Sequence, residues 1–187
     1  MATLTIIFTI ISFIPLILLY VRYPKDTTFT LEHASVHGFN LTSDGHLISF
    51  FDIVVKVNNP SHKIKLDYSA IRVSIFRDKQ NLAEDYLGDF VQPKRNVTVL
   101  RAEPIALNVS KGPLFNLGLE SSIGYIVFDV VITSFLNEWK LEVICEHVIL
   151  NVTTSDYNLV GSSPSSSSSN NFKENFSSID CGVRVYL

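Results

Sequence analysis

The sequence has few of the residues and motifs on which several classes of protein depend. It holds two cysteines, one methionine and one tryptophan in 187 residues. Its formal net charge of -3 excludes the basic excess with which nucleic-acid-binding proteins neutralise phosphates. It also lacks a glycine-rich phosphate loop and the Gly-x-Ser-x-Gly and His-Glu-x-x-His motifs. We therefore expect no nucleic-acid partner, no cofactor, no metal and no enzymatic activity.

The two cysteines restrict the covalent chemistry of the chain. Cys145 and Cys181 are the only pair, so one disulfide is expected in an oxidising compartment. Closing that loop of 36 residues stabilises a fold by about 4 kcal/mol on the chain-entropy model. The alternative is a nucleophilic Cys145 beside His147, but no third group is evident that would orient such a pair. The pattern favours the disulfide.

Charged side chains are absent from residues 1–21. Between Leu4 and Val21, thirteen of eighteen residues are Leu, Ile, Phe or Val. As a helix this stretch is about 27 Å long, close to the roughly 30 Å of a hydrocarbon core. The pattern predicts a transmembrane helix over residues 1–21 and a linker over 22–28. The alternatives are a cleaved signal peptide, for which no small-residue cleavage site is seen, and a buried helix.

Two observations disagree on the side of the membrane that the remaining chain occupies. Arg22 and Lys25 follow the apolar segment, which under the positive-inside rule predicts a cytoplasmic domain. Asn-x-Ser/Thr sequons are instead typical of a lumenal or extracellular domain. Five candidate N-glycosylation sites occur: Asn40, Asn96, Asn108, Asn151 and Asn175.

Residues 29–187 show strand patterns separated by turns about every ten residues. Residues 47–57 alternate cleanly, with Phe51, Ile53 and Val55 on the predicted inner face. One short helix is expected after Pro113, and the serine-rich residues 161–178 are expected to form a mobile loop. The predicted fold class is all-β: an immunoglobulin- or fibronectin-like β-sandwich of seven to eight strands with one short helix, preceded by a single N-terminal transmembrane helix.

Several short motifs follow the apolar segment in a specific order. Arg22-Tyr23-Pro24, Phe29-Thr30-Leu31 and Phe39-Asn40-Leu41-Thr42 come first, and the turn Asn58-Asn59-Pro60-Ser61-His62-Lys63-Ile64 follows. Tyr68 and the two cysteines complete the order. Over residues 22–187 this succession resembles the plant NDR/HIN-like (harpin-induced-like) proteins, which contain a late embryogenesis abundant type 2 (WHy) domain. Asn58, Asn59 and Pro60 correspond to the signature turn of that family.

The chain differs from the family pattern in two places. Ser61 stands where the signature turn has a second asparagine after proline. The basic or cysteine-rich N-terminal segment of the family is also missing. We therefore expect either a longer natural N-terminus or a member with almost no cytoplasmic tail.

The resemblance implies a single-pass protein of the plasma membrane or an endomembrane, with its domain facing the lumen or apoplast. It implies a non-enzymatic interaction protein associated with plant defence (the hypersensitive response) and with stress responses. Besides the membrane, the implied partner is a protein or a cell-wall polymer. The alternatives are a desiccation protectant without a specific ligand, and an extracellular hydrolase whose site the sequence does not reveal.

Overall fold

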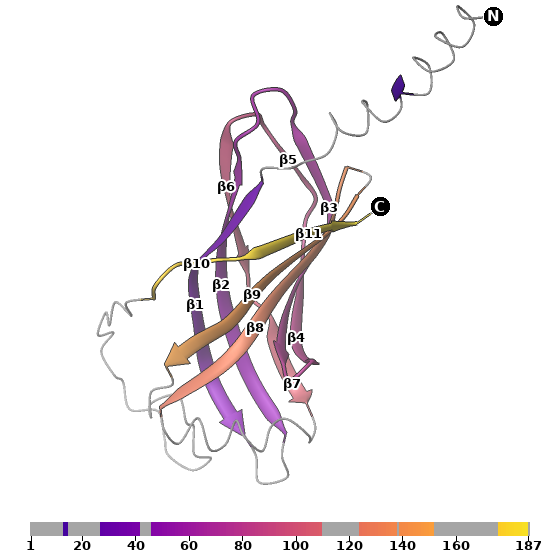
Figure 1. The fold of residues 1–187 in the computed structure, drawn as a ribbon. Coiled ribbons are helices and arrows are strands. Elements are labelled where there is room, and N and C mark those ends of the chain that lie inside the picture. Colours follow the sequence, from indigo (N-terminus) through magenta and orange to yellow (C-terminus); the bar gives the residue numbers. More distant parts are fainter. Residues whose placement is uncertain are drawn as a thin grey trace, which may run out of the picture.

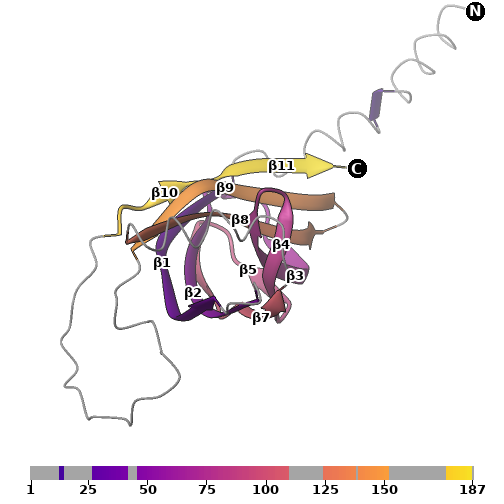
Figure 2. The same ribbon diagram turned by 90° about the horizontal axis from the view of Figure 1, so that it is seen from below.

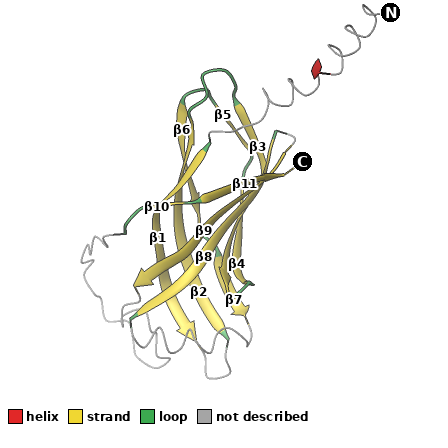
Figure 3. Cartoon of the chain, viewed as in Figure 1, coloured by secondary structure: helices red, strands yellow, loops and turns green. Residues whose placement is uncertain are grey.

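The computed structural model describes residues 13–14, 27–41, 46–109, 124–137, 139–151 and 176–186. Apart from the helical pair Phe13 and Ile14, the ordered elements in these ranges are all β-strands (Figures 1 and 3). The eleven strands are β1 (Thr28–Leu41), β2 (Leu47–Asn59), β3 (Leu66–Arg77), β4 (Gln80–Leu87), β5 (Phe90–Gln92), β6 (Asn96–Ala102), β7 (Ile105–Val109), β8 (Tyr125–Leu136), β9 (Trp139–Asn151), β10 (Ile179–Asp180) and β11 (Gly182–Tyr186).

All eleven strands belong to one antiparallel sheet, in the order β10-β1-β2-β7-β4-β3-β8-β9-β11. β5 pairs with β3 and β6 pairs with β2, beside this path. The sheet curls until it is nearly closed (Figure 2). Its two ends meet at the C-terminal segment, because β10 pairs with β1 and β11 pairs with β9. Cys181 is the one residue between β10 and β11.

The chain is all-β as predicted, but the predicted sandwich architecture is wrong. A sandwich has two separate sheets, whereas here hydrogen bonding continues around the domain. β7 pairs with β2 and also with β4, where Ile105 lies opposite Glu84. The C-terminal residues make the second connection, so the two expected sheets are one, with eleven strands instead of seven or eight.

The structure also does not support the predicted N-terminal transmembrane helix. Nowhere in the described ranges is there a helix with the length and apolar composition to cross a membrane. Residues 1–12 and 15–21 of the predicted helix lie outside the described residues, as does the short helix expected after Pro113. The serine-rich loop predicted over 161–178 lies outside them as far as residue 175.

The core is formed mainly by alternate residues of the long strands β1, β2, β3, β8 and β9, as a pleated backbone requires. Phe51, Ile53 and Val55 of β2 are buried, which confirms the predicted inner face of residues 47–57. Phe51 meets Phe128 of β8 edge to face, with ring centroids 5.3 Å apart. Strands from both halves of the curled sheet therefore share one hydrophobic interior.

Candidate functional site

Cys145 and Cys181 form the predicted disulfide. Cys145 lies on the buried face of β9, and its Cα is 4.4 Å from the Cα of Cys181. The backbone N–H of Cys181 also donates to the carbonyl of Phe29, at 2.9 Å. The C-terminal segment is thus attached to β9 covalently and to β1 by a hydrogen bond. Both sulfur atoms are bonded, so Cys145 is not available as the nucleophile considered from the sequence.

The histidines on β1 make local contacts. His33 lies against the ring of Phe176, with centroids 6.1 Å apart, and the Nε2 atom of His37 is 3.1 Å from Oγ of Ser35. Within the described ranges, no three His, Cys, Asp or Glu side chains are grouped so that they could hold a metal ion.

Four of the five sequon asparagines fall on described strands. Asn40, Asn108 and Asn151 lie at or next to the last residues of β1, β7 and β9, which all run toward the same end of the sheet (Figure 1). Asn96 is the first residue of β6, and its Oδ1 accepts a hydrogen bond from Oγ1 of Thr98 at 3.4 Å. Asn175 lies outside the described residues.

The signature turn is organised by a buried side chain, that of Asn59. Its Nδ2 donates to the carbonyls of Ile64, at 3.2 Å, and Pro93, at 3.0 Å, while its Oδ1 accepts from the N–H of Ser61. Oγ of Ser61 in turn accepts from the N–H groups of Lys63 and Ile64. Serine at this position therefore closes the turn with its hydroxyl. Asn58 is half exposed, and its Nδ2 donates to Oγ1 of Thr28.

Gln92 is a second buried carboxamide at the same end of the sheet, and no sequence motif predicted it. Its Nε2 donates to the carbonyls of Val57, at 2.9 Å, and Asn96, at 3.1 Å. Its Oε1 accepts from the hydroxyl of Tyr68 at 3.5 Å. A polar residue immediately before a proline suggests a solvated turn, so nothing local marks Gln92 as buried.

Tyr68 is buried against two aromatic rings. It stacks on Phe90 with centroids 4.7 Å apart and meets Phe29 edge to face. Burial raises the pKa of Tyr68 well above its ordinary value, and a hydrogen bond with the Thr27 side chain offsets only part of that shift. The phenol is therefore neutral over the physiological pH range.

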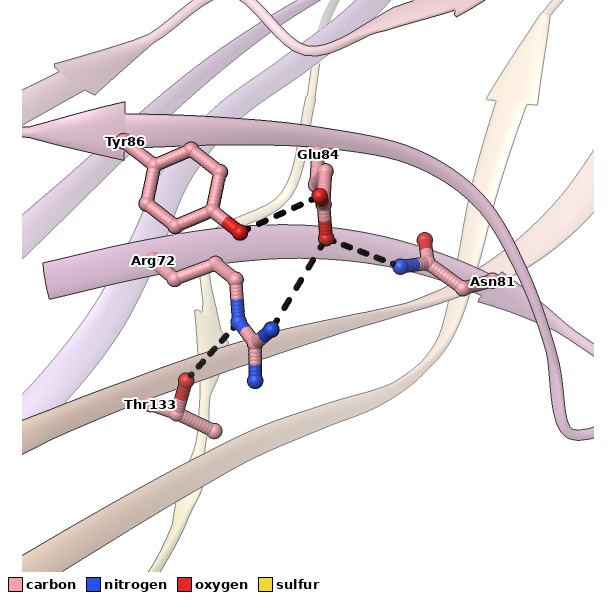
Figure 4. A network of polar contacts seen from close by, with 5 residues as sticks. All are labelled: Arg72, Asn81, Glu84, Tyr86 and Thr133. Atoms are coloured by element: carbon pink, nitrogen blue, oxygen red, sulfur yellow. Dashed lines mark hydrogen bonds and ion pairs between the residues drawn. The ribbon is translucent and has the colours of Figure 1, made fainter.

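On the outer surface, Arg72 of β3 joins polar side chains from its two neighbouring strands, β4 and β8 (Figure 4). Its Nε donates to Oγ1 of Thr133 at 3.4 Å, and its guanidinium lies 3.9 Å from a carboxylate oxygen of Glu84. That carboxylate accepts from the hydroxyl of Tyr86, at 3.1 Å, and from Nδ2 of Asn81, at 3.2 Å. The Tyr86 side chain is 64% exposed, so its ring is open to a partner.

The same pattern continues onto β9 and β11. Glu142 lies opposite Thr133, and its carboxylate accepts from the hydroxyl of Tyr186 at 3.1 Å and pairs with Arg184 at 3.8 Å. Direct cross-strand neighbours share one face of a sheet. Five of them form what we call the Arg72 row: Tyr86, Arg72, Thr133, Glu142 and Arg184. The row crosses β4, β3, β8, β9 and β11, about 19 Å at the usual strand spacing.

A shallow cavity of about 290 Å³ adjoins the end of this row. Arg184 lines it together with Glu146 of β9 and Asp180 of β10. The cavity lies over the segment that the disulfide attaches to β9. The Arg72 row and this cavity form one surface with tyrosine, arginine and carboxylate groups, and this surface is the candidate binding site.

The fold and the site define a disulfide-bonded all-β domain with an exposed polar surface. A scan against protein-family models gives no match to the chain, and searches of curated proteins and of solved structures give none either. The resemblance to NDR/HIN-like proteins stays a prediction from the motifs.

Proposed function

We propose that this chain is a non-enzymatic interaction domain that acts in plant defence and stress responses, in the lumen or the apoplast. The association with defence rests on the resemblance of residues 22–187 to NDR/HIN-like proteins. The interaction role rests on the Arg72 row, in which exposed tyrosine and arginine side chains are held by carboxylates.

Tyrosine and arginine dominate the binding energy of many protein interfaces. On the surface formed by the Arg72 row and its neighbours, these side chains are already ordered before a partner arrives. Glu84 fixes Tyr86 and Arg72, and Glu142 fixes Tyr186 and Arg184. Less side-chain entropy is then lost on binding. Exposed ion pairs contribute about 0–1 kcal/mol to folding. Stability alone is therefore a weak reason for this arrangement, and recognition of a folded partner is the better explanation.

The disulfide supports the proposed compartment. Structural disulfides persist in secreted and lumenal proteins and are rare in the cytosol. The Cys145–Cys181 bond joins the buried face of β9 to the C-terminal segment, and sequons at Asn40, Asn96, Asn108 and Asn151 lie on the described strands. Both features suit a chain that passes through the secretory pathway.

The test is a defence assay with surface variants of the full chain. Arg72→Ala combined with Tyr86→Ala removes one cation and one exposed tyrosine from the row. The control, Lys140→Ala with Tyr125→Ala, likewise removes one cation and one tyrosine from exposed positions outside the row. We expect the row variant to lose the hypersensitive response at unchanged protein level, and the control to retain it.

Retention of the response by both variants would contradict the proposal. It would favour the desiccation protectant, because protection through stability and hydration does not depend on two surface side chains. The interaction domain and the desiccation protectant are distinguished by measuring how well the same two purified variants protect a dehydrated client enzyme.

A further inference from the structure

The turns between β2 and β3 and between β5 and β6 lie at the end of the sheet opposite the ends of β1, β7 and β9 that carry Asn40, Asn108 and Asn151 (Figure 1). The turns at residues 60–65 and 93–95 contain Lys63, Lys65, Lys94 and Arg95 and no acidic residue. The other 178 residues therefore sum to a formal charge of -7, given the total of -3. All four basic residues are exposed, and none forms an ion pair with another described residue. We call these two turns the basic tip.

The basic tip is held in place by buried groups. The side chain of Asn59, which directly precedes the first turn, is 1% exposed. It donates a hydrogen bond to the carbonyl of Pro93 in the second turn and so links the two turns. Gln92, fully buried, binds the carbonyl of Asn96 on the other side of the second turn. The N–H of Arg95 also donates to the carbonyl of Ser61, at 3.0 Å. The four cations are therefore presented from a rigid base, which reduces the entropy that an anionic ligand must overcome.

We propose that the basic tip binds an acidic polysaccharide, a linear chain of uronate sugars. This site is separate from the Arg72 row, and the proposal goes beyond the proposed function by naming a ligand class. Lysine and arginine side chains attract carboxylates by charge and by charge-assisted hydrogen bonds. Four cations on adjoining turns match a ligand with repeated carboxylates better than one with a single anion.

The cations continue from the tip along β6. Arg101 is exposed and lies six residues after Arg95, about 20 Å away along an extended strand. Between Arg95 and Arg101, the exposed side chains of Val97 and Val99 alternate with half-buried side chains. Among the described strands β6 pairs only with β2, so its other edge has no strand partner there. This track suits an extended chain with carboxylates, hydroxyls and apolar ring faces.

A bilayer surface is the less suitable ligand. Segments that bind the membrane interface usually insert Trp, Phe or Leu below the headgroups. The two turns expose no large hydrophobic side chain of that kind. Acidic polysaccharides also occur outside the cytosol, where a disulfide such as Cys145–Cys181 persists.

The experiment measures binding of polygalacturonate to the full, disulfide-bonded chain by titration calorimetry at low and high salt. Lys94→Gln with Arg95→Gln tests the tip. Lys79→Gln with Lys140→Gln is the control, which removes two exposed cations elsewhere. Arg95 and Lys79 both have positive φ, 50° and 67°, so the two variants also match in backbone conformation.

We expect wild-type chain and control to bind polygalacturonate alike, and the tip variant to bind about 25-fold more weakly, at about fivefold per charge. We expect this difference to shrink at high salt. The titrations are repeated after enzymatic removal of N-linked glycans, because Asn96 adjoins Arg95.

Three results would overturn the proposal. The first is no binding of polygalacturonate by the glycan-free chain at low salt, and the second is an equal loss of affinity in both variants. The third, from a parallel titration with vesicles that contain phosphatidylserine, is binding to the vesicles and not to polygalacturonate. The last result would identify a lipid surface as the ligand. Circular dichroism of each variant tests whether the fold is retained, which distinguishes a loss of binding from a loss of structure.

Discussion

Nδ2 of Asn59 lies 3.0 Å from the carbonyl oxygen of Pro93, 34 residues away in the sequence. The same nitrogen reaches the carbonyl of Ile64, and Oδ1 of the side chain accepts from the N–H of Ser61. One carboxamide thus supplies hydrogen bonds to three backbone groups that would otherwise need water as their partner. The fixed position of the basic tip relative to β2 follows from this side chain.

Asn59→Ala is expected to destabilise the domain by about 2–4 kcal/mol, because it leaves three backbone groups without their partner. Urea unfolding of the purified chain measures this change. Asn58→Ala is the control, since Asn58 is half exposed and makes a single long hydrogen bond. Its effect is expected to stay within about 0.5 kcal/mol. Similar losses in the two variants would show that the hydrogen bonds of Asn59 contribute little.

Reduction of the disulfide is expected to destabilise the chain by about 4 kcal/mol, given the 36-residue separation of Cys145 and Cys181. The measurement is urea unfolding with and without reductant. A variant with both cysteines changed to alanine is the control, and reductant should leave its unfolding midpoint unchanged. If wild type and variant respond alike to reductant, the stabilisation has another origin.

The sequence predicted those features that depend on near neighbours. Residues 47–57 alternate with period two, which is enough to assign Phe51 and Ile53 to the interior. Asn59 and Pro60 have the local chemistry of a turn, and two cysteines allow one pairing. Each of these predictions needed only a short stretch of chain or a count of one residue type.

Features that depend on strand order were not predictable in this way. Arg72 and Thr133 are 61 residues apart and meet only because β3 pairs with β8. Gln92 is buried only because β5 and β6 meet the end of β2 and Tyr68. The single curled sheet likewise depends on long-range pairing at β7 and at residues 179–186. The alternation of apolar residues does not distinguish such a sheet from a sandwich.

Tyr68 is expected to make the domain sensitive to alkali. Its folded-state pKa is raised by burial, so the neutral phenol favours the folded state. This contribution is complete below about pH 10, the unfolded-state pKa of tyrosine, and falls as the pH rises toward the folded-state pKa. Unfolding free energies measured from pH 8 to pH 11.5 should fall less steeply for Tyr68→Phe than for wild type, by up to about 1.4 kcal/mol per pH unit.

Tyr86→Phe is the control for this prediction, because Tyr86 is an exposed tyrosine of the same sheet. Its dependence on pH should follow that of wild type. Equal slopes for wild type and Tyr68→Phe would mean that the buried phenol does not limit stability at high pH.

The Arg72 row is expected to matter little for folding. Arg72 and Glu84 are both well exposed, and their charged groups are 3.9 Å apart, so solvent screens the attraction. Arg72→Ala with Tyr86→Ala should therefore shift the unfolding free energy by less than about 1 kcal/mol. Thermal and urea unfolding check this value. A loss of several kcal/mol would assign the row to stability, and a loss of the defence response by the same variant would then have a structural cause instead of a lost partner.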